Sequence, residues 1–392
     1  MDVRLPPAAW RDREGLSGLA DALGADRGEA RYVGGAVRDT LLGLEVADID
    51  IATIHSPDQV LARLGAAGIR AVPTGLAHGT VTAVLPSGPV EVTTLRRDVA
   101  TDGRHAEVAF SDDWEEDAGR RDFTINALYA DPDDGTVFDH HGGLADLAAG
   151  RVRFIGDPLR RIAEDHLRIL RFFRFHARFG DRVDADGLLA CRARANDLMA
   201  LSRERIASEL LKLLVARAAV PVMRLMVENG VLRAVLPEIA PDGVARLEAV
   251  AGREAAAGIT PDAIRRLAAL LPREAAEPVG ARLKLSNADR KRLEAATLGA
   301  GDEGPRALAY RHGPAVALDR LLLAGGPVDA VRDWTPPAMP LSGGELVRRG
   351  LAKGPDVART LRTLETRWIA AGFPPAIPDA EIDQAVADAI SA

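Results

Sequence analysis

Two aspartates separated by one residue, Asp48 and Asp50 in the stretch DIDIAT, are the residues of this chain best suited to metal chemistry. Alternate residues of a β-strand point to the same face, so we expect both carboxylates to project together while Ile49 and Ile51 pack behind them. Adjacent carboxylates repel each other unless a cation lies between them, and oxygen donors alone suit Mg²⁺ or Mn²⁺. The pair predicts a two-metal site, in which the ions activate a hydroxyl and stabilise the leaving oxygen of a phosphoryl group.

A third carboxylate would complete such a site, and Glu91 in the predicted strand VEVTT is our candidate for catalysis. Asp98 and Asp131 remain open as alternatives. The polar stretch that follows Glu91 is interrupted by Gly103, which predicts a mobile active-site loop in which Arg104 contacts the nucleotide.

Gly34, Gly35 and Arg38 lie just before the two aspartates, between a predicted strand and a predicted helix. Without side chains at the glycines, backbone N–H groups can approach an anion, and the start of a helix adds partial positive charge. A guanidinium at Arg38 would complete a clamp for a triphosphate. A simple tight turn would use the same glycines, but the combination with Asp-x-Asp on the next strand favours nucleotide binding.

These motifs, followed by two more in the same order, give the chain a family resemblance. GGAVRD…DIDIAT, RRDFTINAL (Arg120–Leu128) and EDHLRILRFFRF (Glu164–Phe175) resemble the class II tRNA nucleotidyltransferases, which comprise CCA-adding enzymes and bacterial poly(A) polymerases. LSRERIASELLKLL (Leu201–Leu214) resembles the helix that follows in that family. The resemblance extends from Tyr32 to about Leu236 and is loose beyond it.

The resemblance implies a polymerase-β-like head with a five-stranded sheet, then helical neck, body and tail. It also implies untemplated addition of CMP and AMP from CTP and ATP to a tRNA 3′ end. The residues carried over by position are Gly35 and Arg38 for the triphosphate, Asp48 and Asp50 for the metals, Arg121 and Asp122 for the ribose, and Asp165, Arg168, Arg171 and Arg174 for contacts to the nucleotide.

The chemistry of Asp165 and Arg168 agrees with that assignment. On one continuous helix the two side chains share a face. The carboxylate can accept a hydrogen bond from the amino group of cytosine or adenine, and the guanidinium can donate to a ring acceptor of either base. The alternative is an ordinary surface ion pair between residues three apart. Arg174 would point about 180° away from Asp165 on an ideal helix, which places it off the base unless the helix bends.

The ribose assignment has an alternative of the same kind. Asp122 can accept a hydrogen bond from a ribose 2′-hydroxyl and Arg121 can reach phosphate, or the two can form a salt bridge that orients the following segment. Thr124 and Asn126 are interpreted as residues that make local hydrogen bonds.

Composition sets the broad class. With 392 residues the chain is too long for one ordinary core, and 47% hydrophobic with 27% charged residues is a globular composition. The net charge of −7 argues against general nucleic-acid binding, yet residues 151–178 hold eight arginines against one glutamate and two aspartates. That segment is predicted as a binding surface or a solvated helix face.

The single cysteine, Cys191, excludes an internal disulfide and a zinc site made of cysteines, and we expect it to be buried. No apolar run approaches ~20 residues and the first residues lack a signal-peptide pattern, so we expect a cytoplasmic protein without a membrane anchor. Nothing in the sequence indicates a stable protein partner.

The elements that must position these residues change in type along the chain. Short runs rich in β-branched residues predict strands in the first part, namely ARYVGG, DIDIAT, HGTVTAVLP, PVEVTTL and GTVFDH. Ser56–Gly68 predicts a helix with a capping box between Ser56 and Gln59. From Asp157 onward only helical periods recur, with predicted starts at Thr260, Ser286 and Ser342.

We therefore predict an α+β N-terminal nucleotidyltransferase head, residues 1–145, followed by an all-α neck, body and tail. The neck, residues 146–215, would select the nucleotide, and the body and tail, residues 216–392, would bind tRNA.

Four rival functions remain. A poly(A) polymerase, a CC-adding enzyme and an A-adding enzyme share the motifs with an enzyme that adds CCA. The resemblance implies a basic C-terminal extension in poly(A) polymerases, whereas Asp379–Ala392 is acidic, which favours CCA addition. The fourth rival, a non-catalytic RNA-binding factor on the same scaffold, is disfavoured because Arg38, Asp48 and Asp50 are all present.

Overall fold

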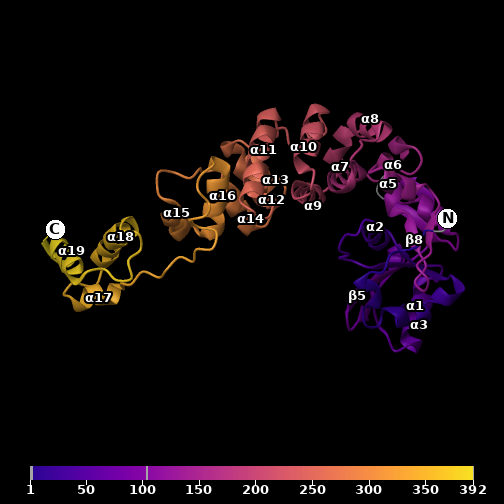
Figure 1. The fold of residues 1–392 in the computed structure, drawn as a ribbon, viewed down its shortest axis with the longest axis horizontal. Coiled ribbons are helices and arrows are strands. Elements are labelled where there is room, and N and C mark those ends of the chain that lie inside the picture. Colours follow the sequence, from indigo (N-terminus) through magenta and orange to yellow (C-terminus); the bar gives the residue numbers. More distant parts are fainter. Residues whose placement is uncertain (1–2, 103–104, 392) are drawn as a thin grey trace. The chain divides into compact units, whose positions relative to one another are not determined.

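The computed structural model describes residues 3–102 and 105–391. Contacts divide the chain into two compact units, Met1–Pro241 and Asp242–Ala392. All strands of the described residues lie in the first unit, before residue 140, and helices make up most of the chain after that point (Figure 1). The predicted change from strands to helices is confirmed.

A seven-stranded sheet in the order β3-β4-β5-β2-β1-β8-β9 forms the centre of the head. Its strands are β1 (Ala30–Val33), β2 (Asp50–Thr53), β3 (Arg70–Gly75), β4 (Thr80–Leu85), β5 (Gly88–Thr94), β8 (Leu128–Ala130) and β9 (Val137–Asp139). The expected number of five strands is wrong because the sequence patterns missed β3 and β8. β3 is mostly exposed and contains a proline, and β8 is three residues buried on both faces, so neither shows the alternation of a half-buried strand.

The stretch predicted as a mobile loop after Glu91 is instead a pair of antiparallel strands, β6 (Arg96–Asp102) and β7 (His105–Phe110), in a sheet of their own. Its polar sequence lacks the apolar alternation by which a strand is recognised. Gly103 and Arg104 lie outside the described residues, so the suggested contact of Arg104 stays untested.

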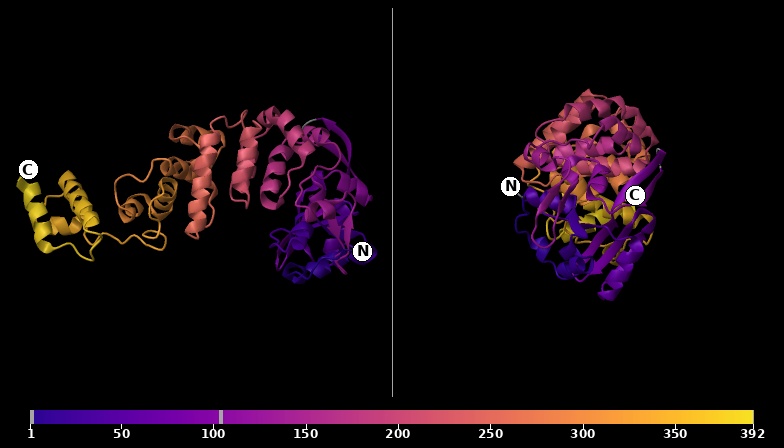
Figure 2. Two further views of the ribbon diagram at one scale, coloured as in Figure 1. Left: turned by 45° about the horizontal axis from the view of Figure 1, so that its top comes forward. Right: turned by 90° about the vertical axis from the view of Figure 1, so that its right-hand side faces the viewer.

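Some helices of the first unit pack against this sheet and the others continue the chain beyond it, as Figure 2 also shows. They are α1 (Leu16–Ala22), α2 (Gly35–Leu41), α3 (Pro57–Ala66), α4 (Trp114–Gly119), α5 (Gly143–Ala148), α6 (Pro158–Glu164), α7 (Arg168–Phe179), α8 (Ala185–Ala193), α9 (Arg203–Leu214) and α10 (Ala219–Glu228). The capping box predicted for α3 is present: Ser56 and Gln59 exchange both hydrogen bonds.

Apolar side chains cover both faces of the sheet. Ile49 and Ile51 are buried in one cluster with Val92, which confirms that they pack behind the aspartates. On the other face, Val33 and Tyr129 belong to a second cluster. Cys191 is buried, as predicted, on α8.

The C-terminal unit is helical throughout its regular structure. Its helices are α11 (Pro241–Ala256), α12 (Ala263–Leu270), α13 (Ala276–Arg282), α14 (Asn287–Ala296), α15 (Pro305–His312), α16 (Pro314–Ala324), α17 (Gly343–Arg348), α18 (Pro355–Ala370) and α19 (Asp379–Ser391). The predicted starts of α14 and α17, after Ser286 and Ser342, are confirmed, and the Ser286 side chain caps α14 by accepting from the Asp289 N–H. α12 begins after Asp262 and not at Thr260. Asp262 is the N-cap of α12, because its carboxylate accepts from two backbone N–H groups of the first turn.

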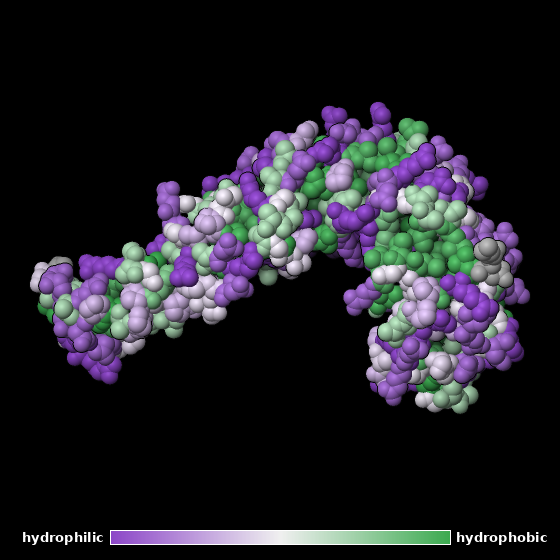
Figure 3. All heavy atoms as spheres, in the orientation of Figure 1, coloured by the Kyte–Doolittle hydropathy of each residue, from purple (hydrophilic) through white to green (hydrophobic). Residues whose placement is uncertain are grey.

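Polar side chains spread over the visible surface of both units, with apolar ones between them (Figure 3). Among the described residues, no helix combines the length and hydropathy that a membrane span requires.

Candidate active site

One cavity of the N-terminal unit brings together almost all of the predicted site residues. Its lining includes Gly34, Gly35, Arg38, Asp48, Asp50, Arg121, Asp122, Asp165, Arg168, Arg171 and Arg174. Residues from the start of α2, from the start of β2, from the segment after α4 and from α7 thus meet at one place. Glu91 is absent from this lining.

Asp48 and Asp50 both face the cavity, although only Asp50 belongs to a strand. β2 begins at Asp50, so Asp48 lies two residues before it, which corrects the prediction of a strand over both. The chain is nevertheless extended there, since the Glu91 N–H donates to the Ile49 carbonyl. Within the described residues neither aspartate has a hydrogen-bond or ion-pair partner, which leaves oxygen donors free for a cation.

The electrostatics of Asp50 reflect this crowding of carboxylates. Burial, Glu91 and Asp48 raise the pKa of Asp50 to about 6, against the opposing effect of Arg121. Desolvation and nearby negative charges disfavour the ionised carboxylate and so raise its pKa. A bound cation would lower that pKa again. The described residues contain no group of three or more His, Cys, Asp or Glu already arranged as a metal site.

Glu91 lies beside Asp50 in the parallel register of β2 and β5, and it is exposed. Its influence on Asp50 fits the predicted role of third carboxylate, but its place outside the cavity lining leaves that role a prediction. Asp131 instead accepts from backbone N–H groups of Asp133 and Asp134 in the turn after β8. The side chain of Asp98 is not among those described.

The two glycines before α2 have different reasons to be glycine. Gly34 has φ +68° and ψ −119°, a backbone conformation that only glycine adopts readily. A side chain there would also begin 3.5 Å from Arg121 Nη1. Gly35 has an ordinary helical start, and a Cβ would meet only Arg38 Nη2 at 3.8 Å. Gly34 is therefore required by the turn, whereas Gly35 leaves its helix N–H beside the cavity without a side chain.

Arg38 is almost fully buried on α2, and its guanidinium is shared between two side chains. Nε and Nη2 contact Asp39 Oδ1 at 2.8 and 2.7 Å, and Nη1 donates to the side-chain oxygen of Asn126. The guanidinium also lies over the rings of Phe175 and Phe179 of α7. Burial lowers the pKa of Arg38, and the cations of α7 lower it further, against the effect of Asp39.

Arg121 is oriented by a carboxylate and a phenol. It donates to Asp117 Oδ2 at 3.2 Å and to the Tyr129 hydroxyl at 3.1 Å, while that hydroxyl donates to Asp117 at 2.7 Å. The expected salt bridge between Arg121 and Asp122 is absent from the described contacts, because each residue has other partners.

Asp122 is buried and its two oxygens are already bound. Oδ1 accepts from the Phe123 N–H and from Asn126 Nδ2, each at 2.9 Å, and Oδ2 accepts from Arg171 at 2.6 Å. Burial alone would raise the pKa of Asp122, but Arg171 and Asn126 outweigh it and hold the pKa below its usual range. Asp122 is thus a charged acceptor at the cavity wall.

The segment predicted as one nucleotide-selecting helix is broken at Asp165. α6 ends at Glu164, Asp165 is extended with φ −149°, and α7 begins at Arg168. The Asp165 carboxylate accepts from the Leu167 N–H, so this N–H bonds to a side chain where a continuous helix would bond it to a backbone carbonyl. The prediction of a shared helical face for Asp165 and Arg168 is therefore wrong in geometry, although both side chains line the cavity.

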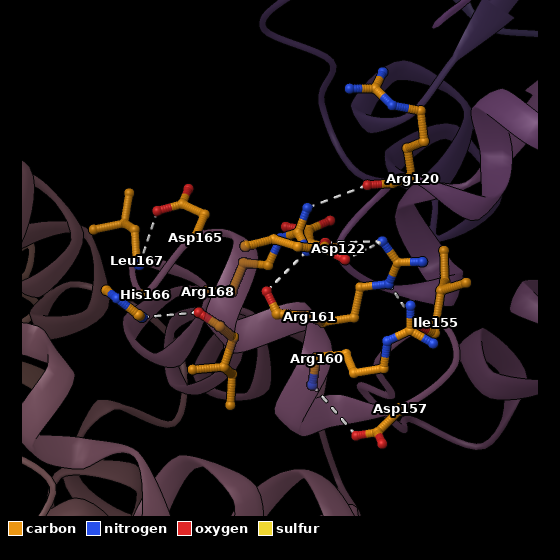
Figure 4. Close-up of polar contacts among 12 residues, drawn as sticks. Arg120, Asp122, Ile155, Asp157, Arg160, Arg161, Asp165, His166, Leu167 and Arg168 are labelled. Atoms are coloured by element: carbon orange, nitrogen blue, oxygen red, sulfur yellow. Dashed lines mark hydrogen bonds and ion pairs between the residues drawn. The ribbon is translucent and has the colours of Figure 1, made fainter. Parts of the chain in front are cut away.

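Asp165 and Arg168 have separate partners, as Figure 4 shows. Arg168 bonds to Glu164, to the Arg161 carbonyl and to the Arg120 carbonyl. Asp165 accepts from Arg205 of α9 at 2.9 and 3.2 Å. Asp165 and Arg168 therefore do not form the surface ion pair that was considered as the alternative.

Arg174 lines the cavity, which corrects the placement expected from an ideal helix. Because α7 starts only at Arg168, the angle measured from Asp165 does not apply. Arg174 contacts Glu209 of α9 at 2.5 Å and lies 4.1 Å from the centre of the Phe175 ring. It is held between a carboxylate and an aromatic face.

The sequence reasoning missed several lining residues or gave them a lesser role, among them Asp39, Asp117, Asn126 and Arg178. Asn126 was expected to bond locally, but it bridges Arg38 and Asp122, which are 84 positions apart. Asp39 connects α2 to Arg178 of α7 at 3.0 Å. Asp39 lies in the motif GGAVRD, Asn126 in RRDFTINAL and Arg178 in the arginine-rich segment 151–178, whereas Asp117 carries no such signal.

Comparison with known proteins adds an independent observation. Residues 30–153 match the model of the poly(A) polymerase head domain, and residues 182–242 match that of a probable RNA- and SrmB-binding site of polymerase A. The mitochondrial CCA tRNA nucleotidyltransferase 1 of Mus musculus is 36% identical over 92% of this chain and 87% of its own length. This chain belongs to the class II CCA-adding enzyme and poly(A) polymerase family. It is therefore a nucleotidyltransferase, as predicted.

Relatives in bacteria and solved structures agree with this family. The CCA-adding enzyme of Levilactobacillus brevis is 43% identical over 48% of this chain and 47% of its own. The CCA-adding enzyme of Bacillus stearothermophilus in complex with CTP superposes with a TM-score of 0.69 at 25% identity, over 91% of this chain and 93% of that one. The Thermotoga maritima CCA-adding enzyme complexed with tRNA gives a TM-score of 0.70 at 19% identity, over 95% of each chain, and shows likeness of fold. The predicted α+β head with helical continuation is confirmed.

Proposed function

We propose that this family member adds CMP and AMP to the 3′ end of tRNA, forming CCA from CTP and ATP with release of pyrophosphate. One observation carries the proposal: Asp48 and Asp50 share a single cavity with the arginines of α7, in a chain that resembles CCA tRNA nucleotidyltransferases along most of its length. Metal ligands, triphosphate contacts and base contacts are all needed within the reach of one nucleotide, and this cavity supplies candidates for each.

Asp48 and Asp50 would hold Mg²⁺, or Mn²⁺ in its place. The fit rests on oxygen donors without a described partner and on the carboxylate crowding that raises the pKa of Asp50. The bound ions supply activation of the attacking tRNA hydroxyl and stabilisation of charge on the phosphoryl oxygens.

The remaining residues bind and orient the nucleotide. Gly34, Gly35 and Arg38 would accommodate the triphosphate, and Arg121 and Asp122 the phosphate and ribose. Arg171 and Asn126 hold Asp122 ionised. Because both of its oxygens are already bound, a ribose 2′-hydroxyl would replace one of the present donors, and such a contact would favour NTP over dNTP.

Asp165 and Arg168 would read the base, with Arg171 and Arg174 as further contacts along α7. Cytosine and adenine both present an amino group to a carboxylate, whereas guanine and uracil present a carbonyl there. A buried acceptor left without a donor costs roughly 1–3 kcal/mol, which is enough for selection between these bases. Asp165 is bound to Arg205 in the structure, so a base that donates to Asp165 would have to replace Arg205 as its partner.

A product-sequencing assay tests the function. The protein is incubated with Mg²⁺ and a tRNA that lacks its 3′ CCA, with each NTP singly and with CTP and ATP together. We expect CMP additions from CTP alone and a complete CCA end from the mixture, with no incorporation from GTP or UTP.

Each rival function predicts a different product. A long adenylate run from ATP alone indicates a poly(A) polymerase, cytidylate without terminal adenylate a CC-adding enzyme, and adenylate only on a tRNA ending in CC an A-adding enzyme. Binding of tRNA without any incorporation indicates a non-catalytic RNA-binding factor. Any of these results rejects the proposal.

Two further assignments belong to the proposal. The division into a head (1–145), a nucleotide-selecting neck (146–215) and a tRNA-binding body and tail (216–392) is consistent with helices that begin after residue 140. A cytoplasmic location is also proposed, and cell fractionation tests it, since relatives such as the mouse protein are mitochondrial.

A further inference from the structure

The cavity-facing arginines of α7 follow the helix repeat. Arg168, Arg171, Arg174 and Arg178 are spaced by three or four residues and therefore lie along one face of the helix. Ten residues of helix between the first and the last span about 15 Å. Arg178 is the member of this row that has no role in the proposed function.

The partners of these arginines follow the order of the parts of a nucleotide. Arg168 lies at the end of α7 where Asp165 is proposed to read the base. Three residues on, Arg171 binds Asp122, the proposed ribose contact. At the other end of the helix, Arg178 binds Asp39, the neighbour of the proposed triphosphate residue Arg38. The row thus leads from the base to the phosphates.

The charges at the Arg178 end do not balance. Asp39 is a single carboxylate, yet Oδ1 accepts from Arg38 and Oδ2 accepts from Arg178 at 3.0 Å. By contrast, Arg171 and Arg174 each contact a carboxylate of their own, Asp122 and Glu209. Two guanidinium groups that share one negative charge leave one positive charge over.

Arg178 is also placed to reach a ligand. Its side chain is 41% exposed, whereas that of Arg38 is 5% exposed. Both guanidinium groups lie over the ring of Phe179, 4.7 and 4.5 Å from its centre, so the two cations are held close together. The guanidinium groups of Arg38 and Arg178 repel each other. Burial lowers the pKa of Arg38, and Arg178 and Arg174 lower it further. An anion bound beside Arg178 would relieve this repulsion.

We propose that Arg178 binds the terminal phosphates of the incoming nucleoside triphosphate and retains contact with the pyrophosphate product. This inference rests on the proposed function, since it assumes that the cavity binds a nucleotide with its base near Asp165. Arg178 acts here as a binding residue that Asp39 orients.

The experiment compares ligands that differ only in phosphate. The affinities of CTP, CMP and inorganic pyrophosphate are measured by calorimetry with Mg²⁺, for the full chain and for Arg178→Gln. We expect CTP and pyrophosphate to bind about 10-fold more weakly to the variant, and CMP to bind as before, because CMP lacks the terminal phosphates. Arg178→Lys retains the charge and should recover most of the CTP affinity. Arg192→Gln, an exposed arginine of α8 outside the cavity, is the matched control.

A purely structural role for Arg178 predicts a different result. If the Asp39–Arg178 pair only fixed α2 against α7, Asp39→Asn would weaken CTP and pyrophosphate as much as Arg178→Gln does, and that outcome overturns the inference. If Arg178 itself binds the phosphates, Asp39→Asn should cost less affinity, because the cation remains. Unchanged CTP affinity in Arg178→Gln overturns the inference as well. If wild type binds CTP but does not extend tRNA, the proposed function fails while the role of Arg178 is still decided by these affinities. If wild type binds none of the three ligands, both fail.

Discussion

The two units of this protein each contain a network of arginines and carboxylates, and the two networks differ in how completely their charges are matched. In the C-terminal unit, Asp319 of α16 binds Arg265 of α12 and Arg292 of α14, and Arg265 also binds Glu254 of α11. Asp319 and Glu254 are 0% and 1% exposed. Every carboxylate oxygen of these two residues has a guanidinium partner.

The cavity of the N-terminal unit is incomplete by the same measure. Asp48 and Asp50 have no partner among the described residues. Arg38 and Arg178 share the one carboxylate of Asp39, whereas in the C-terminal network Arg266 also binds Glu254 and Arg292 also binds Asp262, so that three arginines face three carboxylates. Like charges crowded together without partners are unfavourable, so such an arrangement persists where a ligand completes it. The comparison teaches that a network with matched charges stabilises a fold, whereas one with unmatched charges indicates a binding site.

The largest effect is expected when the carboxylates of the unmatched network are removed. Replacing both Asp48 and Asp50 by Asn should reduce nucleotide incorporation by about 10³-fold or more, because the metal ligands are lost. Incorporation is measured with truncated tRNA and CTP, and circular dichroism checks the fold. Glu45→Gln, an exposed neighbour outside the cavity lining, should retain activity. Wild-type turnover in the double variant would reject the metal assignment.

The next largest effect is expected on the stability of the C-terminal unit, when a carboxylate of the matched network is removed. Asp319→Asn removes the fully buried carboxylate that Arg265 and Arg292 share, leaves each with one remaining carboxylate, and should lower the free energy of unfolding of the C-terminal unit by about 3 kcal/mol. Urea denaturation measures the loss, and CTP affinity should not change. Asp329→Asn, whose side chain is 91% exposed, should change stability by less than about 0.5 kcal/mol. Equal stabilities of the two variants would show that the buried network contributes little.

A smaller effect concerns base selection at the edge of the cavity. Asp165→Asn should reduce kcat/KM for CTP and ATP by about 10- to 100-fold, while GTP and UTP gain relative to them, because an amide can donate to a carbonyl. Arg205→Gln removes the present partner of Asp165 but keeps the carboxylate, and should cost no more than a few-fold. Kinetics with all four NTPs decide; unchanged selectivity in the Asn variant contradicts the base-reading role.

The smallest effect is a gain in stability from the same unmatched charges. The pKa of Asp50, about 6, lies above its ordinary value near 4, so the ionised form destabilises the metal-free fold. The penalty is absent below about pH 4 and complete above about pH 6. In EDTA, Asp50→Asn should therefore be more stable than wild type by about 1–2 kcal/mol near pH 7.5, after allowance for solvent screening, and equal to it near pH 4. Denaturation at both pH values measures this, and a less stable variant near pH 7.5 would contradict it.

The sequence predicted the chemistry better than the geometry. Motif spacing brought Asp48, Asp50, Arg38 and the arginines of α7 to attention, and all of them line one cavity. The continuous helix through Asp165 was wrong, because a helical period cannot reveal that a carboxylate will take the place of a turn. Strands β3 and β8 were missed because both lack alternation.

Local patterns by themselves determined the family, the change from strands to helices and the residue types at the site, because each depends on neighbours along the chain. The partner of each charge was decided only by the tertiary structure. Asn126 joins Arg38 to Asp122, Arg205 binds Asp165, and Asp39 connects α2 to α7. Hydrogen bonds and ion pairs form across a few ångströms of space, and residues far apart in the sequence come that close only after the sheet and the helices have packed.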